Sequence, residues 1–518
     1  MSASTSKSRS NTERWVLTAS ILGSSMAFID GTVVNVALPV LQKALGATAT
    51  GVQWVIESYA LVLAALLLFG GALADKVGRR RVLAIGLAVF ALASAGCAIS
   101  PSIGWLIAAR GVQGLGAALL IPTSLALLGA AIPAERRGRA IGKWSAFSAA
   151  TAGLGPVLGG WLIQAGSWRS VFWINVPIAV ASLVITFRWV PESRDERARH
   201  LDFAGASLVT LGLGGVVFGL LEAPRLGFGH PAILTSLIAG TLILSGFLMV
   251  ERGAREPMVP LQLFRSRTFS GTNLLTLLLY AALAGAFFFI PFNLIQVHRY
   301  SPAEAGAAMV PVIALMSLLS SRAGRLADRY GVRRPLIIGP LIAGAGFALL
   351  ALPGTGGFYW TTFFPGMLVL GLGMSGTVAP LTTSVMTCFG PERAGVASGI
   401  NNAVSRTASV LAIAVFGLVA YQRFGSSLAA RLDALGPPAA IRHALLTQRG
   451  KLAGMTIPAS VSQPLRGTLE RVVDEAFVDA FALVMLLAAG LALTSAAVAW
   501  ALIEPKRMSS SSEPSSAK

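Results

Sequence analysis

The chain contains 518 residues, of which 54% are hydrophobic and only 12% are charged. Soluble globular proteins carry about 25% charged residues, so this composition excludes an ordinary soluble protein. The formal net charge of +19 would suit a nucleic-acid partner, but the basic residues occur in short clusters between long apolar segments. That distribution is typical of the cytoplasmic loops of a membrane protein, and we therefore expect no nucleic-acid binding.

The apolar segments recur along nearly the whole chain, and each is long enough to cross the roughly 30 Å hydrocarbon core of a bilayer as a helix. We therefore predict an all-α polytopic membrane protein with fourteen transmembrane helices. In chain order, the predicted spans are 15–38, 52–74, 82–99, 103–130, 140–165, 170–190, 203–222, 231–250, 270–297, 302–322, 334–352, 358–388, 394–420 and 475–503.

The basic residues predict the orientation of these spans. An even number of spans places both termini on one side, and most Lys and Arg residues flank the spans on that side. The positive-inside rule makes that side cytoplasmic, so we expect the protein in the cytoplasmic membrane with a cytoplasmic tail at 1–14 and a disordered one at 504–518. The segment 421–474 is the one long connection, and we predict that it is an extracytoplasmic loop.

Three charged residues of the first half, Asp30, Glu57 and Arg110, lie about five or more residues inside predicted spans. At a rise of 1.5 Å per residue, Asp30 lies about 12 Å, Glu57 about 8 Å and Arg110 about 10 Å from the outer face. Charge inside a bilayer is costly, so a shared layer of three charges predicts a proton site in which the guanidinium tunes a carboxyl group. The alternatives are a static Asp30–Arg110 ion pair and, for Glu57, contact with headgroups or water.

A sequence motif occurs twice, in the loops that follow the second and the tenth predicted spans. The first copy consists of Gly71, Asp75, Gly78, Arg79 and Arg80. The second copy repeats the Gly, Asp and Gly spacing with Gly324, Asp328 and Gly331. A parallel internal repeat of this kind is typical of one large class of transporters.

The repeat also predicts the domain organisation. Two six-helix bundles with two inserted helices would give the observed spacing of the two motif copies. We therefore predict an N-terminal bundle at 15–190, an inserted helix pair at 203–250 and a C-terminal bundle at 270–503. The alternative role of the motif is topological, because its positive charges hold a loop in the cytoplasm whatever else they do.

With these motifs the chain resembles the major facilitator superfamily, specifically its fourteen-helix drug:proton antiporters. Residues 30–39 resemble the first-helix motif of that branch, residues 110–117 its fourth-helix motif and residues 168–177 the start of its sixth helix. The antiporter motif of the fifth helix is matched by Gly155, Pro156, Gly159 and Gly160. The resemblance extends from about residue 15 to residue 420.

The resemblance implies a proton-coupled efflux antiporter that exports drugs, antibiotics or other small amphipathic compounds by alternating access. It implies that Asp30 and Arg110 couple protons to transport, together with the acidic residue at Glu57. It also implies that the loop around Asp75 latches the two halves, and that a kink at Pro156 limits leakage. The alternative is an importer or facilitator of a small metabolite on the same fold.

The residues that contact cargo are the hardest to predict. A central apolar cavity is expected to be lined by Met26, Gln113, Phe288, Phe292, Asn293 and Arg406. The alternatives are helix packing for the aromatic residues and interhelical hydrogen bonding for Arg406.

The sequence gives no support for an enzyme. It contains no His-Glu-x-x-His pair, no phosphate-binding Gly-x-x-x-x-Gly-Lys-Ser/Thr loop and no Cys/His cluster, so we expect neither a metal nor a cofactor. Cys97 and Cys388 lie in apolar segments and are expected to be packing residues. The expected partners are protons, small amphipathic substrates and the lipid bilayer, and the protein is expected to work as a monomer.

Overall fold

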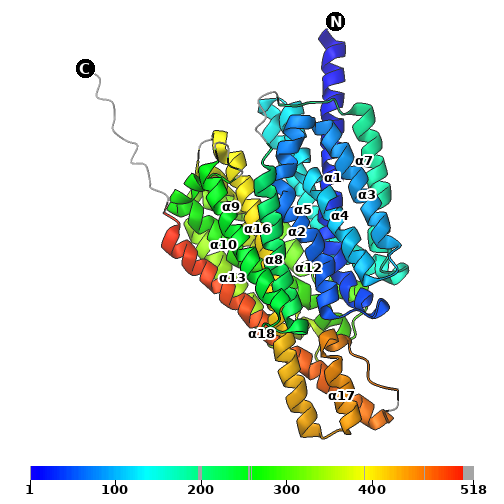
Figure 1. Cartoon of the computed structure of the whole chain (residues 1–518). Coiled ribbons are helices and arrows are strands. Elements are labelled where there is room, and N and C mark those ends of the chain that lie inside the picture. The colour runs from blue at the N-terminus through cyan, green and yellow to red at the C-terminus, as the bar shows by residue number, and fades with distance from the viewer. Residues whose placement is uncertain are drawn as a thin grey trace, which may run out of the picture.

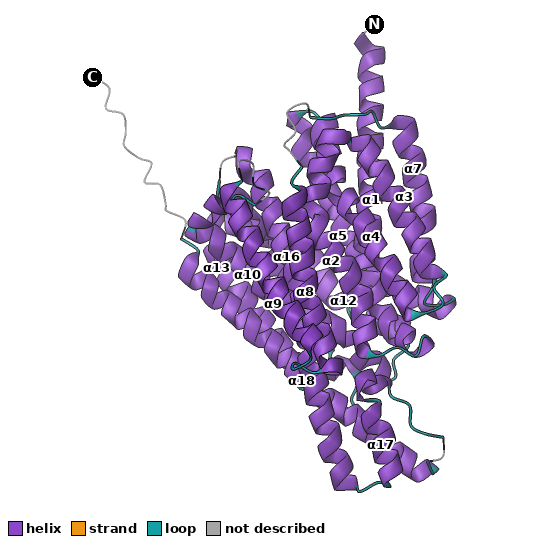
Figure 2. Ribbon diagram, viewed as in Figure 1, coloured by secondary structure: helices purple, strands orange, loops and turns teal. Residues whose placement is uncertain are grey.

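The computed structural model describes residues 2–195, 201–254, 257, 259–389, 391–459 and 461–505. Within these ranges the chain is folded into helices joined by short loops, and none of the described residues lies in a strand (Figure 2). The described part contains 14 helices that are long and apolar enough to cross a membrane. Each overlaps one predicted span, so the predicted number and the all-α class are confirmed.

The first six spans are formed by seven helices, because the sixth span is broken near its start. Pro177 lacks the N–H that would bond to the Trp173 carbonyl in a continuous helix. The seven helices are α1 (Ser2–Ala44), α2 (Ala49–Val77), α3 (Arg79–Ala98), α4 (Ile103–Ala131), α5 (Ala134–Ala165), α6 (Ser170–Trp173) and α7 (Asn175–Trp189). At their starts, α2 and α4 are capped by Thr48 and Ser102, whose side chains accept hydrogen bonds from backbone N–H groups of the first turn.

The other spans and their connecting turns follow in chain order. They are α8 (Phe203–Leu226), α9 (Pro231–Gly253), η1 (Leu261–Arg265), α10 (Arg267–Phe292), η2 (Asn293–Val297), α11 (Pro302–Ala307), α12 (Val310–Tyr330), α13 (Arg333–Leu350), α14 (Tyr359–Thr362), α15 (Phe364–Thr387), α16 (Pro391–Leu435), α17 (Ala439–Thr447), η3 (Arg449–Gly454) and α18 (Gln463–Leu502).

The helices pack in two groups. Helices α1 to α7 contact mainly one another, and α10, α12, α13, α15 and α16 contact mainly one another and α18. The short α11 belongs to the second group by its place in the chain, but it packs mainly on α5. The two groups meet where α5 packs on α11, where α2 packs on α16 and where α1 packs on α10. The pair α8 and α9 is attached through α8, which contacts both α2 and α16 (Figure 1). The division into two bundles and an inserted pair stays a prediction, which these contacts support.

Both ends of the helical bundle can be defined from the course of the chain. Helix α1 begins and α18 ends at the same end of the bundle (Figure 1), which we call the terminal face. The other end is called the opposite face. The last turns of α16, together with α17, η3 and the first turns of α18, project beyond the spans at this opposite face (Figure 1).

The prediction that 421–474 is one loop is wrong, because most of this segment is helical. Helix α16 continues to Leu435 and α18 begins at Gln463. The reason is a continued apolar stripe: Phe424, Leu428 and Leu432 follow one another at intervals of four residues and are fully buried. The 45 residues of α16 therefore form a helix roughly 67 Å long, more than twice the thickness of the hydrocarbon core.

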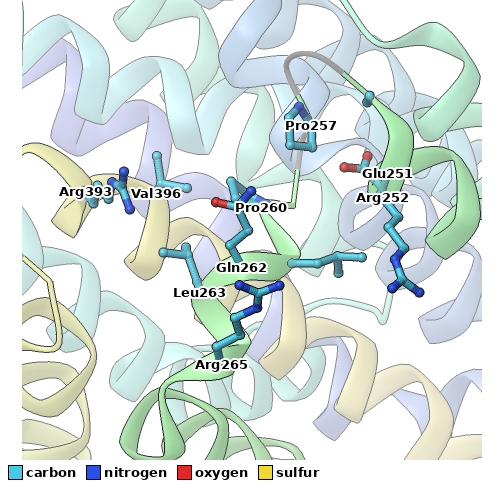
Figure 3. A pocket seen from close by; sticks show the side chains of 11 residues that line it. Glu251, Arg252, Pro257, Pro260, Gln262, Leu263, Arg265, Arg393 and Val396 are labelled. Atoms are coloured by element: carbon cyan, nitrogen blue, oxygen red, sulfur yellow. The ribbon is translucent and has the colours of Figure 1, made fainter.

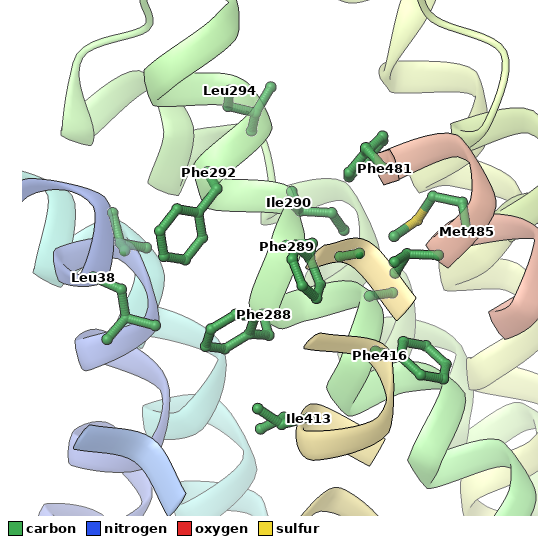
Figure 4. Packing of buried hydrophobic residues seen from close by; sticks show 14 of the residues in the cluster. Leu38, Phe288, Phe289, Ile290, Phe292, Leu294, Ile413, Phe416, Phe481 and Met485 are labelled. Atoms are coloured by element: carbon green, nitrogen blue, oxygen red, sulfur yellow. The ribbon is translucent and has the colours of Figure 1, made fainter. Parts of the chain in front are cut away.

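A buried hydrophobic cluster joins the two groups of helices near the opposite face. In Figure 4, Phe288 and Phe292 of α10 point toward Leu38 of α1, while Phe416 of α16 and Phe481 of α18 lie in the same cluster. All five side chains are at most 3% exposed. Apolar packing therefore closes the contact between α1 and α10 at this face.

Candidate functional site

Asp30 of α1 and Arg110 of α4 form an ion pair in the interior of the first helix group. Both side chains are completely buried, and Nη1 of Arg110 donates a hydrogen bond to Oδ2 of Asp30. The two charges that the sequence placed inside spans are thus in direct contact. A buried charge needs a partner of this kind, because an isolated ion in a low-dielectric interior is strongly destabilising.

Two amide side chains complete the surroundings of the Asp30 carboxylate. Its Oδ1 accepts hydrogen bonds from Nε2 of Gln113 at 2.9 Å and from Nδ2 of Asn175 at 3.0 Å. The same Asn175 nitrogen also contacts Ser94 Oγ at 3.0 Å, and the Ser94 hydroxyl donates to the backbone carbonyl of Phe172 at 2.8 Å. Helices α1, α4 and α7 therefore meet at one carboxylate, and α3 is joined to it through Asn175.

Gln113 has a different place from the predicted one. It was expected in a cargo cavity, but it is fully buried, and its Oε1 accepts a hydrogen bond from Arg110 at 2.8 Å. Sequence reasoning gave Ser94 no role, and it included Asn175 only as part of the sixth-helix motif at 168–177. The available signal was a polar amide at the start of an apolar span, because polar groups between membrane helices usually bond to a neighbouring helix.

The guanidinium of Arg110 is also held by α2. Its Nε donates to the carbonyl of Val55 at 3.1 Å, and its Cζ lies 4.2 Å from the centre of the Tyr59 ring. The Tyr59 hydroxyl in turn donates to the carbonyl of Ala27 on α1 at 3.3 Å. Nη2 of Arg110 has no hydrogen-bond partner within the described ranges. Arg110 therefore links α1, α2 and α4, and one of its donors stays available.

Glu57 is buried but does not join this cluster. Its side chain is 0% exposed, and neither carboxyl oxygen has a hydrogen-bond partner among the described residues. One turn away on α2, Gln53 donates to the carbonyl of Ile413 on α16 at 3.2 Å, so this side of α2 is directed toward the second helix group. Burying a charged carboxylate without a partner is costly, and the neutral acid is the form that suits this position.

The three charges that were predicted to share one layer therefore do not form one cluster, and the shared layer stays a prediction. Helix α1 continues to Ala44, and the 14 residues that separate Asp30 from this end correspond to about 21 Å. Asp30 thus lies farther from the end of its helix than predicted, and of the three charges only Asp30 and Arg110 come together.

The predicted gating loop is fixed within the first helix group. Gly78 ends α2 with a φ of 127°, a conformation that favours glycine. Asp75 pairs with Arg79 at 2.8 Å, and the backbone N–H of Arg80 donates to Glu192 Oε1 at 3.0 Å. A side chain at Gly78 would meet the same Glu192 carboxyl group at 2.9 Å. These contacts hold the loop against the segment that follows α7, and they involve no residue of the second group.

The structure says less about Gly71 and Asp328, the two remaining residues of the predicted gating loop. Gly71 lies on α2 against α4, where an added Cβ would be 3.3 Å from Cβ of Pro122. Asp328 belongs to α12, but its side chain lies outside the described part of the structure.

The antiporter motif lies where α5 is wedged between α1 and α11. An added Cβ at Gly155 would lie 1.9 Å from Thr32 Oγ1, and one at Gly159 would lie 2.8 Å from the carbonyl oxygen of Val33. On the other side, a Cβ at Gly160 would lie 2.3 Å from the carbonyl oxygen of Pro302. Pro156 takes part through its backbone, whose carbonyl oxygen would lie 2.2 Å from a Cβ at Gly306. These distances are too short for any side chain. Gly155 and Gly159 therefore permit the contact of α5 with α1, and Gly160 and Gly306 permit its contact with α11 of the second helix group.

The residues predicted to line one cargo cavity are dispersed. Phe288 and Phe292 border a narrow cavity near the opposite face, with a volume of only about 10 Å³. Asn293 is buried in η2, and Met26 is fully buried in the packing of the first group. Arg406 is half-buried on α16 with its Cζ 5.9 Å from the Phe28 ring, and no ion pair with it occurs in the described structure.

A separate cavity of about 760 Å³ lies at the terminal face, between the end of α9, η1 and the start of α16 (Figure 3). Its lining includes the exposed residues Arg252, Arg265 and Arg393. It contains none of the groups that bind Asp30 and lies at the other end of the spans from the narrow cavity. Its basic lining is the pattern that the positive-inside rule produces in loops.

Comparison with known proteins decides the family. Residues 20–413 match the Major Facilitator Superfamily. The chain belongs to this superfamily. It is therefore a multi-pass membrane transporter and not an enzyme, as the resemblance in the sequence implied.

Several superfamily relatives are similar to this chain over most of their length. The Multidrug resistance protein Stp of Mycobacterium tuberculosis is 34% identical over 440 residues, which cover 84% of this chain and 81% of that protein. The tetracenomycin C resistance and export protein of Streptomyces glaucescens is 33% identical over 492 residues, which cover 93% and 90%. The puromycin resistance protein of Streptomyces alboniger is 36% identical over 412 residues, which cover 78% and 81%.

Solved structures of the superfamily share the fold. A bacterial homologue of the human lysosomal transporter Spinster, in an inward-facing conformation, matches with a TM-score of 0.65 and 17% identity over 94% of this chain and 98% of that one. The inward-open xylose transporter of E. coli matches with a TM-score of 0.55 and 15% identity over 96% and 97%. At these identities the likeness concerns the fold alone.

Proposed function

We propose that this transporter is a proton-coupled efflux antiporter of the cytoplasmic membrane, which exports drugs, antibiotics or other small amphipathic compounds by alternating access. The observation that carries the proposal is the Asp30 carboxylate, buried inside the spans and bound by Arg110, Gln113 and Asn175. This carboxylate joins α1, α4 and α7 directly.

The coupling follows from what a proton does to this ion pair. At an effective dielectric constant of 20, two opposite unit charges 4 Å apart attract each other by about 4 kcal/mol. A proton on Asp30 removes this attraction, and Arg110 keeps its bonds to Val55 and its contact with Tyr59 on α2. Protonation of Asp30 therefore weakens the contact between α1 and α4, whereas α4 remains attached to α2. The protonation state of Asp30 thereby changes which position of α1 relative to α2 and α4 is the more stable one.

Glu57 is proposed as a second proton-binding group. It lies on the side of α2 that faces α16, one turn from the Gln53 contact with the second helix group. A carboxyl group at this boundary is neutral when the two groups are closed around it. Separation of α2 from α16 would expose it to water and allow it to ionise.

The direction of transport is proposed from the loops and the relatives. The basic clusters of the terminal face predict that both termini are cytoplasmic, and α5 with α11 and α1 with α10 then close the outer side. The relatives include proteins named for multidrug resistance, tetracenomycin C export and puromycin resistance. These names favour export of foreign or self-made compounds over import.

Inside-out membrane vesicles test the proposal with ethidium as the probe. An acidic lumen should drive ethidium accumulation by the native protein, and an uncoupler should abolish it. In the Asp30→Asn variant, pH-driven ethidium accumulation should fall at least tenfold, because the substitution removes the proton-binding group. The variant should still exchange ethidium across the membrane when no pH gradient is imposed, because the transport path is intact.

A matched control is available at Asp433. This carboxylate is exposed at the opposite face and pairs only with Arg442, at 2.8 Å, in the described structure. Asp433→Asn should therefore retain the full pH-driven rate. Equal accumulation by the native protein and Asp30→Asn would contradict the proposed role of Asp30.

A further inference from the structure

We propose that η3 is a lid over the outer end of the transport path, with Leu452 as the plug that must lift before cargo leaves. The inference rests on the proposed function, which places the opposite face outside the cell. It assigns a role to the segment 449–454, part of the connection 421–474 for which the sequence offered no chemistry.

The lid is attached to both helix groups. Nε2 of Gln42, at the end of α1, donates to the carbonyl of Lys451 at 3.0 Å, and Nε2 of Gln296 in η2 donates to Gln42 Oε1 at 2.8 Å. A Cβ at Gly450 would lie 3.9 Å from Cγ2 of Thr48, which caps α2. One short turn therefore contacts α1 and α2 of the first group as well as η2, α16 and α18 of the second.

Leu452 holds an unfavourable backbone conformation in order to point inward. Its φ of 52° lies in the left-handed region, which glycine adopts freely and which bulky residues such as leucine rarely adopt. The side chain is nevertheless 4% exposed, and it borders the narrow cavity that Phe288, Phe289 and Phe292 also line. Strain of this kind persists only where the surroundings impose it and is concentrated at clamps and switches.

The lid is built to move as a unit. Gln448 precedes η3 and Thr456 follows it, and three hydrogen bonds join them: Gln448 Nε2 donates to the Thr456 carbonyl at 3.1 Å, and Gln448 Oε1 accepts from the Thr456 N–H at 3.2 Å and hydroxyl at 3.0 Å. These bonds close the base of the turn. Lifting the lid from the first helix group therefore requires its contacts with Gln42 and Thr48 to break, and lifting it from the second group also breaks its contacts with η2, α16 and α18.

Alternating access makes this movement obligatory. Outward opening has to separate α1 and α2 from α10 and α16, and η3 spans that boundary. The narrow cavity under Leu452 is bordered by α2, α10 and α16 and by Pro224 of α8, so it lies where a path to the outside would emerge. A lid that stayed in place would hold the two groups together.

A reversible crosslink between Thr48→Cys and Gly450→Cys tests the lid. In inside-out vesicles, oxidation should form the disulfide, confirmed by mass spectrometry, and should lower pH-driven ethidium accumulation at least tenfold. A reductant should restore it. The two single-cysteine variants, with Cys97 and Cys388 left in place, should be insensitive to oxidation.

A second pair controls for crosslinking within the lid itself. Gln448→Cys with Thr456→Cys ties the base of η3 without joining it to the first helix group, so oxidation should leave at least half of the transport rate. Full transport by the oxidised Thr48/Gly450 pair, or failure of that pair to crosslink, would overturn the lid. Loss of transport by the reduced pair and the native protein alike would instead refute the proposed efflux function.

Discussion

Substitution of one glycine should loosen the contact that closes the opposite face. In Gly160→Ala, the new Cβ would lie 2.3 Å from the Pro302 carbonyl oxygen and 2.7 Å from Cα of Ala303, both backbone atoms that cannot rotate away. Helices α5 and α11 must then separate by about 1 Å to restore an ordinary contact of 3.4 Å. Overpacking of this kind costs roughly 1–3 kcal/mol.

The cost falls on the closed state, because opening at the opposite face relieves the clash. Since about 1.4 kcal/mol is a factor of ten, the ratio of open to closed molecules should rise roughly fivefold to more than a hundredfold. The assay is the labelling rate of Val157→Cys by a membrane-impermeant maleimide. Val157 lies at the same contact, where a Cβ at Gly306 would be 3.3 Å from its Cα.

Gly142→Ala supplies the matched control on the same helix. An added Cβ at Gly142 has nothing within 4 Å, so this variant carries the same gain in helix propensity without the clash. Its labelling rate should equal that of the parent. An unchanged rate in Gly160→Ala would refute the idea that the glycines of α5 set the closure of the opposite face.

Two further predictions concern the buried charges. Arg110→Lys keeps the charge but loses the planar guanidinium that bonds to Asp30, Gln113 and Val55 together, so the rate of pH-driven ethidium transport should fall at least tenfold. Arg225→Lys is the control, because Arg225 is exposed and its ion pair with Glu222 lies outside the site; this variant should transport ethidium at the native rate. Glu57→Gln preserves shape and removes the proton-binding group, so its unfolding temperature should stay within a few degrees of the parent while fewer protons are exchanged per ethidium molecule. A native proton count in Glu57→Gln, measured with a pH-sensitive dye in proteoliposomes, would remove Glu57 from the mechanism.

The fold could be predicted because the bilayer imposes a strong rule. Every span needs about 20 apolar residues, and the fourteen segments were visible for that reason. Asp30 and Arg110 were identifiable because charges are rare inside such segments. The place of Asn175 and Ser94 in the site was missed because uncharged polar residues are common in spans, and only the three-dimensional packing shows which of them face a carboxylate.

Other features depend on tertiary contacts that no short pattern encodes. The attachment of the Asp75 loop to the chain after α7 joins residues more than a hundred positions apart, as in the bond from Arg80 to Glu192. The helical extension of α16 was in principle readable from Phe424, Leu428 and Leu432, but a search for spans stops where polar residues begin to alternate with the apolar ones. The positive φ of Leu452 has no sequence signal at all.

The central claim is that Asp30 carries the proton that is exchanged for cargo. The most direct test is the release of protons when ethidium is added to the purified protein in a weakly buffered solution, followed with a pH-sensitive dye. The native protein should release about one proton per bound ethidium, and Asp30→Asn should bind ethidium while releasing at most half as much. Equal proton release from both proteins, or none from the native one, would contradict the account.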